Sequence, residues 1–212
     1  MEKISRRNVI GIAAGALASG VLAGEPAEAQ IAPPDDKQGT EPAGASTGKT
    51  DSPYKFRLGA ATSRQFGEST VREHKLHDFP MSSNMAATLI RLAVGDFREP
   101  HWHPNSDEWL FVMSGTIRMT IVDGKGESSR FTCGPEDVAF TPLGFGHYVE
   151  NVGDIAANVM VIHNHADFTT VNLSEWAAAG KGSIFAETLK MPAESFDDVP
   201  TKRVFIGRKH PR

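Results

Sequence analysis

The segment that decides the fold is Gly95-Asp-Phe-Arg-Glu-Pro-His101-Trp-His103-Pro-Asn-Ser-Asp-Glu108, which runs on through Trp-Leu-Phe-Val-Met-Ser to Gly115. His101 and His103 stand two residues apart, so on an extended chain both imidazoles leave the same face of a sheet. Glu108 follows a Pro-Asn-Ser turn that folds it back beside them. Two imidazoles and a carboxylate facing a protein interior are costly unless something binds and neutralises them. The spacing therefore predicts a divalent metal site.

A second segment, Pro142-Leu-Gly144-Phe-Gly-His147-Tyr-Val-Glu-Asn151, supplies one more histidine. Two glycines permit a tight turn, and His147 begins the strand that follows. Taken alone, this segment is equally well an ordinary turn with one core histidine. Paired with the first segment, His147 becomes the fourth ligand of the same ion. Three imidazoles and one carboxylate leave open positions on an octahedral metal, which is typical of catalytic rather than structural sites.

The middle of the chain, residues 55–163, consists of short apolar or alternating runs between turn signals, with no helical period of adequate length. The expected strands are 85–94, 108–113, 116–122, 131–132, 137–141, 147–152 and 157–163. This pattern predicts an all-β sandwich or barrel. The expected helices, which follow the strands and pack on them, are 173–179, 184–191 and 193–198. Arg98 and His101 stand three residues apart and cannot share one face of a straight strand, so a site that uses both side chains requires a bend or bulge near Pro100.

The first thirty residues have the layout of a signal peptide. Ser5-Arg6-Arg7-Asn8 precedes an apolar run, and Ala27-Glu-Ala29 offers a cleavage site. The paired arginines resemble the twin-arginine export signal of bacteria, so we expect export to the periplasm or the medium. The apolar run is shorter than the roughly 20 residues that span a bilayer. We expect residues 1–29 to be the signal peptide, 30–53 a Pro- and Gly-rich flexible linker, and 54–212 one domain with a helical C-terminal extension.

The composition of the chain excludes several classes of function. The chain has 212 residues, 40% of them hydrophobic, and a net charge of −4 from 22 basic and 26 acidic side chains. Nothing resembles the basic stripe of a nucleic-acid-binding protein. Cys133 is the only cysteine, which excludes an intramolecular disulfide and a zinc site built on several thiolates. Eight histidines direct any metal chemistry toward imidazole and carboxylate ligands.

The two motifs are signatures of the cupin superfamily, and the chain resembles the bacterial oxalate decarboxylases within it. The matching segments are Met85-Ala-Ala-Thr-Leu-Ile-Arg-Leu92, Arg98-Glu-Pro-His-Trp-His-Pro-Asn-Ser-Asp-Glu-Trp109, Gly146-His-Tyr-Val-Glu-Asn151 and Val171-Asn-Leu-Ser-Glu-Trp176. Together they span roughly residues 54–180. The resemblance implies a double-stranded β-helix (jelly-roll) barrel that binds Mn²⁺, with Fe²⁺ less favoured, through the four residues named above. It also implies a small dicarboxylate, oxalate, as substrate and dioxygen as co-catalyst.

The resemblance further implies roles for three side chains. Arg98 occupies the place of the arginine that orients oxalate, although the same residue could simply form a surface salt bridge. A lid acid protonates the carbon that remains after loss of carbon dioxide, giving formate. By count from Trp176 this acid is Asp167, with His165 in a position to assist; alternatively, both face solvent. Without a positioned acid, the expected outcome is oxidation to carbon dioxide and hydrogen peroxide.

The chain also departs from the family pattern. Oxalate decarboxylases carry two cupin domains, whereas this sequence has room for one. Glu136 replaces a glycine that is usual in the second motif, and Val161 stands where one domain of the family has a glutamate. Because a single barrel leaves sheet edges and apolar faces to cover, we expect a homo-oligomer. Two other functions stay open: an iron enzyme acting on another small acid or diketone, and a metal-binding or storage cupin without catalysis.

Overall fold

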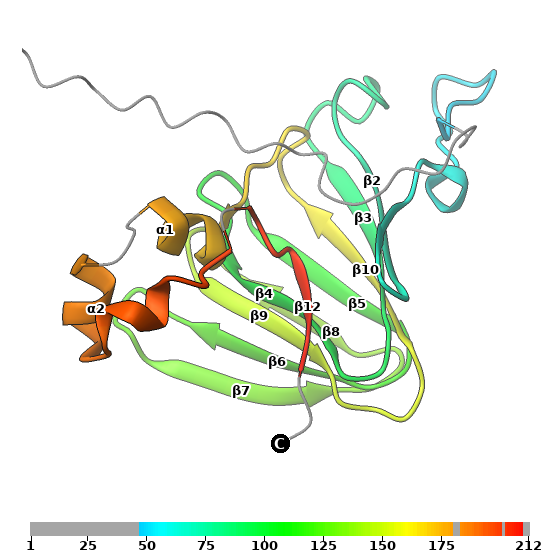
Figure 1. Ribbon diagram of the computed structural model, residues 1–212. Coiled ribbons are helices and arrows are strands. Elements are labelled where there is room, and N and C mark those ends of the chain that lie inside the picture. Colours follow the sequence, from blue (N-terminus) through cyan, green and yellow to red (C-terminus); the bar gives the residue numbers. More distant parts are fainter. Residues whose placement is uncertain (1–46, 180–182, 201, 210–212) are drawn as a thin grey trace, which may run out of the picture. The chain divides into compact units, whose positions relative to one another are not determined.

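The computed structural model describes residues 47–179, 183–200 and 202–209 (Figure 1). The expected signal peptide and residues 30–46 of the expected linker lie outside these ranges. The last residues of that linker form a turn joined to the domain: Lys49 pairs with Phe56, and the Arg57 N–H donates to the Gly48 carbonyl at 2.8 Å. No helix among the described residues is long and apolar enough to cross a membrane.

Two antiparallel six-stranded sheets form the domain, as Figure 1 shows. The first contains, in spatial order, β1 (Arg64–Phe66), β2 (Ser69–His74), β3 (Ala86–Leu92), β10 (Ala157–His163), β5 (Glu108–Ser114) and β8 (Val138–Thr141). The second contains β11 (Val171–Asn172), β4 (Asp96–Trp102), β9 (Gly146–Asn151), β6 (Ile117–Val122) and β7 (Ser128–Cys133), with β12 (Ile206–Arg208) also on β4. From β3 to β11 the chain crosses repeatedly between the sheets. The predicted all-β jelly-roll barrel is therefore confirmed.

The core lies between the inner faces of the two sheets. Along β10, buried and partly exposed residues alternate, as expected for a strand with one face in the interior. The fully buried apolar side chains of the core include Leu92, Leu110, Val112, Ile117, Met119 and Val159. Burying one such side chain contributes about 1.5–3 kcal/mol. These packed apolar side chains fix the positions of the strands that carry the polar side chains described below.

The expected irregularity near Pro100 is present in β4. Pairing between β4 and β9 shifts register between Arg98 and His101, so that Arg98 faces Val149 and His101 faces His147. Proline has no N–H to donate to the ladder, which favours a break in pairing at this point. The shift brings both Arg98 and His101 to the buried side of the same strand.

The C-terminal region combines the expected helices with an unexpected strand. Its helical elements are α1 (Leu173–Ala179), α2 (Ser183–Leu189) and the 3₁₀ turn η2 (Ala193–Phe196); another 3₁₀ turn, η1 (Leu58–Ala60), precedes β1. After η2 the chain returns to the second sheet, where Ile206 pairs with Arg98. The Phe205 N–H donates to a carboxylate oxygen of Glu99 at 2.5 Å. The C-terminal extension therefore contributes a strand beside Arg98 in addition to its helices.

Glu136 adopts a backbone conformation that suits glycine, with φ 71° in the turn before β8. This left-handed conformation costs an L-residue roughly 1–2 kcal/mol. Glycine recovers that cost but loses about 0.5–1 kcal/mol through its freer unfolded chain. We expect Glu136→Gly to raise the free energy of unfolding by up to about 1 kcal/mol, measured by urea denaturation at an unchanged m value. In the control Glu127→Gly, where φ is not positive, stability should fall; equal losses in both variants contradict the argument.

Candidate metal centre and adjoining cavity

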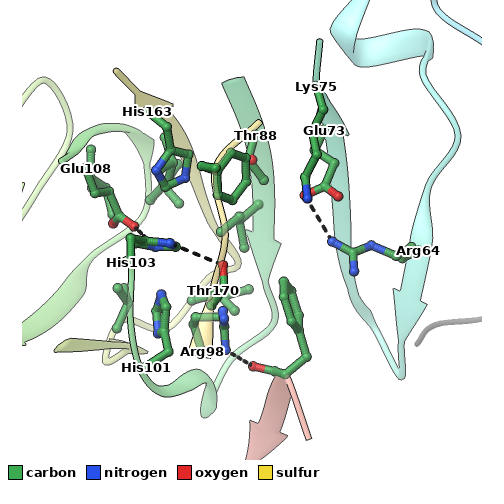
Figure 2. A pocket seen from close by; sticks show the side chains of 18 of the residues that line it. Arg64, Glu73, Lys75, Thr88, Arg98, His101, His103, Glu108, His163 and Thr170 are labelled. Atoms are coloured by element: carbon green, nitrogen blue, oxygen red, sulfur yellow. Dashed lines mark hydrogen bonds and ion pairs between the residues drawn. The ribbon is translucent and has the colours of Figure 1, made fainter. Parts of the chain in front are cut away.

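A cavity lies inside the barrel, with an empty volume of about 630 Å³ including solvent at its mouth. Figure 2 shows His103 and Glu108 on one side of it and Arg64 and Glu73 on the other. Arg98 enters from β4, so its guanidinium and the imidazoles of the first motif line the same space.

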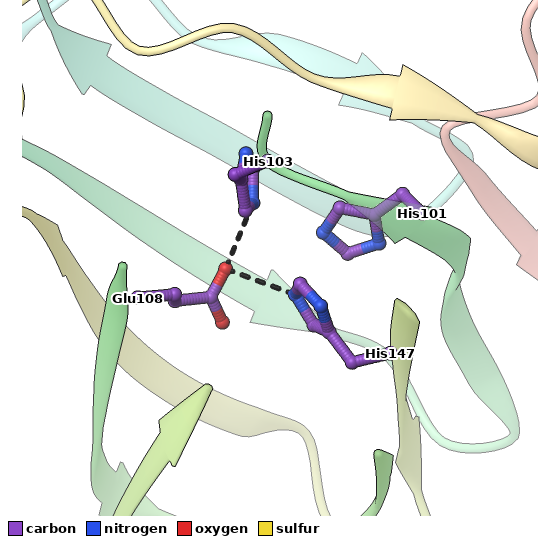
Figure 3. A group of neighbouring side chains, drawn as sticks. All are labelled: His101, His103, Glu108 and His147. Carbon is purple, nitrogen blue, oxygen red and sulfur yellow. Dashed lines mark hydrogen bonds and ion pairs between the residues drawn. The ribbon is translucent and has the colours of Figure 1, made fainter. Parts of the chain in front are cut away.

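The four predicted ligands lie together (Figure 3), and three of them, His101, His103 and Glu108, line this cavity. One potential ligand atom from each of His101, His103, Glu108 and His147 lies within 4.8 Å of the others, and all four residues are buried. β4 carries His101, the chain just after it carries His103, and Glu108 and His147 come from β5 and β9. The β4–β9 pairing places His101 directly opposite His147. The register of the barrel therefore assembles the cluster from both sheets.

Each histidine of the cluster is held in one orientation by a backbone carbonyl. The acceptors of His101, His103 and His147 are, in that order, the carbonyl oxygens of Glu99 at 2.7 Å, Thr169 at 2.8 Å and Phe145 at 3.1 Å, each bonded to Nδ1. A carbonyl oxygen only accepts, so each Nδ1 carries the ring proton and each Nε2 presents a lone pair. This is the arrangement that orients histidine ligands around metals in proteins.

The surroundings of the Glu108 carboxylate indicate a binding site for a cation. Its Oε2 lies 3.1 Å from Nε2 of both His103 and His147. Burial raises the pKa of Glu108; if both histidines also carried a proton on Nε2, the charge of His147 and the hydrogen bonds that both rings donate would outweigh burial and hold that pKa well below its usual value. With the ring protons on Nδ1, lone pairs of nitrogen and oxygen face each other across these contacts. A divalent ion among the four donors resolves that conflict, so these residues fit a metal of the kind that imidazole and carboxylate ligands bind.

Arg98 provides a fixed positive charge next to the cluster. Its guanidinium donates to Asn172 Oδ1 at 2.7 Å and to the Phe205 carbonyl at 3.1 Å, and it lies 3.9 Å from the Phe205 ring centroid. Burial lowers the pKa of Arg98 to about 9, while neighbouring Glu99 opposes this shift. The side chain is thus charged at neutral pH and held firmly. Burial and the Arg98 charge, in that order, lower the pKa of His101 well below its usual value, keeping this ligand neutral.

The structure brings the predicted ligands and Arg98 together but places Asp167 and His165 elsewhere. Both lie exposed in the loop between β10 and β11, outside the residues that line the cavity. Asn105 anchors this loop: its amide donates to the Asp167 carbonyl at 3.2 Å and accepts from the Thr169 N–H at 2.8 Å. In this arrangement the carboxyl of Asp167 does not face the metal cluster.

The cavity is also lined by residues that the motifs did not indicate. His163 stacks on Phe168 with ring centroids 3.7 Å apart, and its ring lies 4.5 Å from that of His103. Burial lowers the pKa of His163 to about 3. The alternation along residues 157–163 predicts that His163 faces the interior, because it stands two and four residues after the core residues Val161 and Val159. Arg64 and Arg203, from outside both motifs, also line the cavity, and the sequence carries no comparable signal for them.

Comparison with known proteins agrees with this geometry. The cupin family matches residues 60–189. A probable oxalate decarboxylase of Arthroderma benhamiae is 32% identical over 166 residues, covering 77% of this chain and 41% of that protein. Germin-like protein 5-1 of Oryza sativa subsp. japonica is 27% identical over 165 residues, covering 76% of this chain and 69% of that protein.

Among solved structures, one of Bacillus subtilis oxalate decarboxylase with Mn(II) centres superposes with a TM-score of 0.71 at 28% identity. It covers 77% of this chain and 43% of that chain. The chain thus spans about two fifths of the length of the oxalate decarboxylases it matches.

Proposed function

Because the chain belongs to the cupin family, we propose that it is a manganese-dependent enzyme that degrades oxalate to formate and carbon dioxide. One observation carries the proposal: the buried cluster of three histidines and Glu108 opens onto a cavity that contains the fixed cation of Arg98. The similarity to oxalate decarboxylases, one of which has Mn(II) centres, supports the choice of substrate and metal.

The donor set suits an anionic substrate. Three neutral imidazoles and one carboxylate leave a divalent ion with a net positive charge and open positions. When bound, manganese supplies a Lewis acid for a carboxylate and, with dioxygen as co-catalyst, a centre for electron transfer. The buried guanidinium of Arg98 pairs with the carboxylate oxygens and fixes the orientation of the acid. Fe²⁺ fits the same ligands and is the less favoured metal.

Whether the second carbon of oxalate becomes formate depends on a proton donor. The carbon–carbon bond of the oxalate dianion breaks, carbon dioxide leaves, and the electron pair that remains on the second carbon takes up one proton to give formate. We propose Asp167 as the donor and His165 as its assistant. For Asp167 to reach the cavity, the 164–170 loop must exchange it with Phe168, which occupies the lining position in the structure.

Asp167→Ala tests this assignment directly. We expect formate release to fall at least about tenfold and peroxide release to rise, because general acid catalysis contributes about 10²–10⁴-fold where it operates. Formate and peroxide are quantified in the same reaction with manganese-loaded protein. The control is Asp154→Ala, which alters an exposed aspartate in another loop. Release of formate at the original rate from the Asp167 variant contradicts the assignment.

The exposed positions of Asp167 and His165 favour a second candidate, oxalate oxidation. Two carboxylates are found among the described residues that line the cavity: Glu73, which pairs with Arg64 at 3.2 Å, and the proposed ligand Glu108. Without a proton donor, oxalic acid transfers two electrons and two protons to dioxygen. The products are then carbon dioxide and hydrogen peroxide.

One assay separates the candidates. Manganese-loaded protein is supplied with oxalate in air, and formate, peroxide and carbon dioxide are measured together. Formate supports the decarboxylase, and peroxide without formate supports the oxidase. The absence of both products overturns the proposed enzyme and favours a metal-binding or storage cupin.

A homo-oligomer remains part of the proposal. Met113, Val138 and Phe140, on β5 and β8, are each about half exposed. They form an apolar area on the first sheet that a second copy of the chain would cover.

A further inference from the structure

The guanidinium of Arg98 is bonded to two neutral acceptors. Its Nη2 donates to Oδ1 of Asn172 at 2.7 Å, and its Nη1 donates to the Phe205 carbonyl at 3.1 Å. A carboxylate oxygen of Glu99 lies 3.9 Å from Nη1, which is too far for a hydrogen bond. Among the described residues, no carboxylate is hydrogen-bonded to this guanidinium. Because amide oxygens carry no net charge, they hold Arg98 without cancelling its positive charge.

Asn172 links Arg98 to a carboxylate on its other side. While Oδ1 of Asn172 accepts from Arg98, its Nδ2 donates to Oε2 of Glu175 at 2.6 Å. Arginine only donates and a carboxylate only accepts, so the amide satisfies both neighbours in a single orientation. Asn172 is 0% exposed, so water does not take the place of either bond. An asparagine here accepts from the cation and donates to the anion, which neither an aspartate nor a leucine does.

The same two residues also form the start of α1. Glu175, in the first turn, accepts from the backbone N–H of Asn172 at 3.3 Å, which is the reach-back contact of a capping box. The polar side chain before a helix normally accepts a backbone N–H of the first turn. Here the Asn172 oxygen is bonded to Arg98, and Glu99 accepts from the Ser174 N–H at 3.1 Å. A capping position is therefore used to hold a buried arginine.

Neither residue of this pair lines the cavity. Arg98 does line it (Figure 2), whereas Asn172 and Glu175 are not among the lining residues. Asn172 lies opposite the proposed ligand His101 in the pairing of β11 with β4, the strand that carries Arg98. An effect of Asn172 on a molecule bound in the cavity therefore passes through Arg98.

We propose that Asn172, held by Glu175, is a positioning residue: it fixes the guanidinium of Arg98 at the cavity and keeps the negative charge of Glu175 away from it. The cation then pairs with a carboxylate of the substrate. This inference rests on the proposed function, in which that carboxylate belongs to oxalate. A capping role alone would stabilise α1 and leave the affinity for oxalate unchanged.

An exchange of the two side-chain types tests the inference. The double variant Asn172→Asp, Glu175→Gln keeps the total charge, and its carboxylate accepts both from Arg98 and from the new amide. The exchange moves the negative charge from residue 175 to residue 172, directly against the guanidinium. Calorimetric titration of the manganese-loaded full-length protein with oxalate measures the effect. We expect at least about tenfold weaker binding, because oxalate must compete with a charge-assisted bond inside the protein.

Single variants separate the position of the charge from the bonds. Asn172→Leu has a similar size and removes both bonds, so we expect about ten- to hundredfold weaker oxalate binding. Glu175→Gln keeps an acceptor for the Asn172 amide and should bind oxalate within about threefold of wild type. The matched control is Asn158→Leu on β10, where a partly buried asparagine donates to Ser114 Oγ at 2.8 Å outside the cavity lining. This control should bind oxalate like wild type.

Nuclear magnetic resonance of the arginine guanidinium groups tests the positioning without oxalate. The protein is labelled with ¹⁵N-arginine and loaded with zinc, because manganese broadens nearby signals, and Arg98→Lys identifies the Arg98 resonances. We expect separate Nη1 and Nη2 signals for Arg98 in wild type and in the double variant. In Asn172→Leu these two signals should merge, since the released guanidinium rotates faster.

Three results overturn the proposal: separate Nη signals in folded Asn172→Leu, wild-type affinity for oxalate in the double variant, or equal weakening by Glu175→Gln alone and by the double variant. If circular dichroism shows that Asn172→Leu is unfolded, the double variant decides. If wild type neither binds nor degrades oxalate, the proposed function fails, and the Nη signals alone decide whether Asn172 positions Arg98.

Discussion

Glu108→Gln is expected to reduce bound manganese from about one ion per chain to less than about a tenth of that, and to abolish oxalate turnover. Removal of residues that merely support a ligand costs about 10–100-fold in metal affinity, and Glu108 is itself a proposed ligand. Glutamine keeps the size of the side chain but removes the one negative charge of the cluster. Metal content is measured by mass spectrometry after dialysis.

The control for this variant is His77→Ala. His77 is an exposed histidine outside the cluster, and its Nε2 lies 3.2 Å from Oδ1 of Asp78. We expect it to retain manganese and turnover. If Glu108→Gln keeps a full complement of manganese, the four-ligand assignment is wrong. If it loses manganese but degrades oxalate at the wild-type rate, the metal is not part of the reaction.

Arg98→Gln should lower kcat/KM for oxalate by about 10²–10³ while manganese stays bound, because donors that stabilise a developing negative charge contribute that much. Arg98→Lys restores charge without the planar fork, so its activity should lie between those of Arg98→Gln and wild type. Steady-state kinetics on manganese-loaded protein measures both. This ordering distinguishes a role in orienting the substrate from a purely structural role. In a purely structural role, Arg98→Lys and Arg98→Gln would lose activity in proportion to their loss of stability.

Arg57→Gln provides the matched arginine control, since Arg57 is exposed and outside the cavity. The Arg98 guanidinium also bonds to Asn172 and the Phe205 carbonyl, so thermal unfolding should accompany the kinetics. An Arg98→Gln variant that folds, holds manganese and keeps kcat/KM within twofold of wild type contradicts the assigned role.

Local spacing accounts for the parts of the site that the sequence predicts correctly. The His-x-His spacing directs the imidazoles of His101, in β4, and His103, just after it, to one cluster, and the irregularity near Pro100 follows from the need to bury both Arg98 and His101. Each inference depends only on the period of a strand and on neighbours within a few residues. The same short-range information predicts most strands and helices of residues 85–198, but it does not predict β4, β11 or the first half of β7.

Long-range contacts explain what the sequence does not reveal. Arg203 reaches the cavity because the segment after η2 returns to pair Ile206 with Arg98, and no local pattern specifies that return. The loop carrying Asp167 likewise depends on Asn105, some sixty residues earlier, which bonds its backbone. Glu136 shows a third limit, since the sequence identifies the missing glycine but not that the glutamate retains a left-handed φ.

Electron paramagnetic resonance of the manganese-loaded protein with ¹³C-labelled oxalate tests most directly whether substrate and metal meet at this cluster. We predict a ¹³C hyperfine coupling to Mn²⁺ in the wild-type protein, with the manganese signal changed by oxalate. A manganese spectrum that oxalate leaves unaltered, with no ¹³C coupling, would contradict the account.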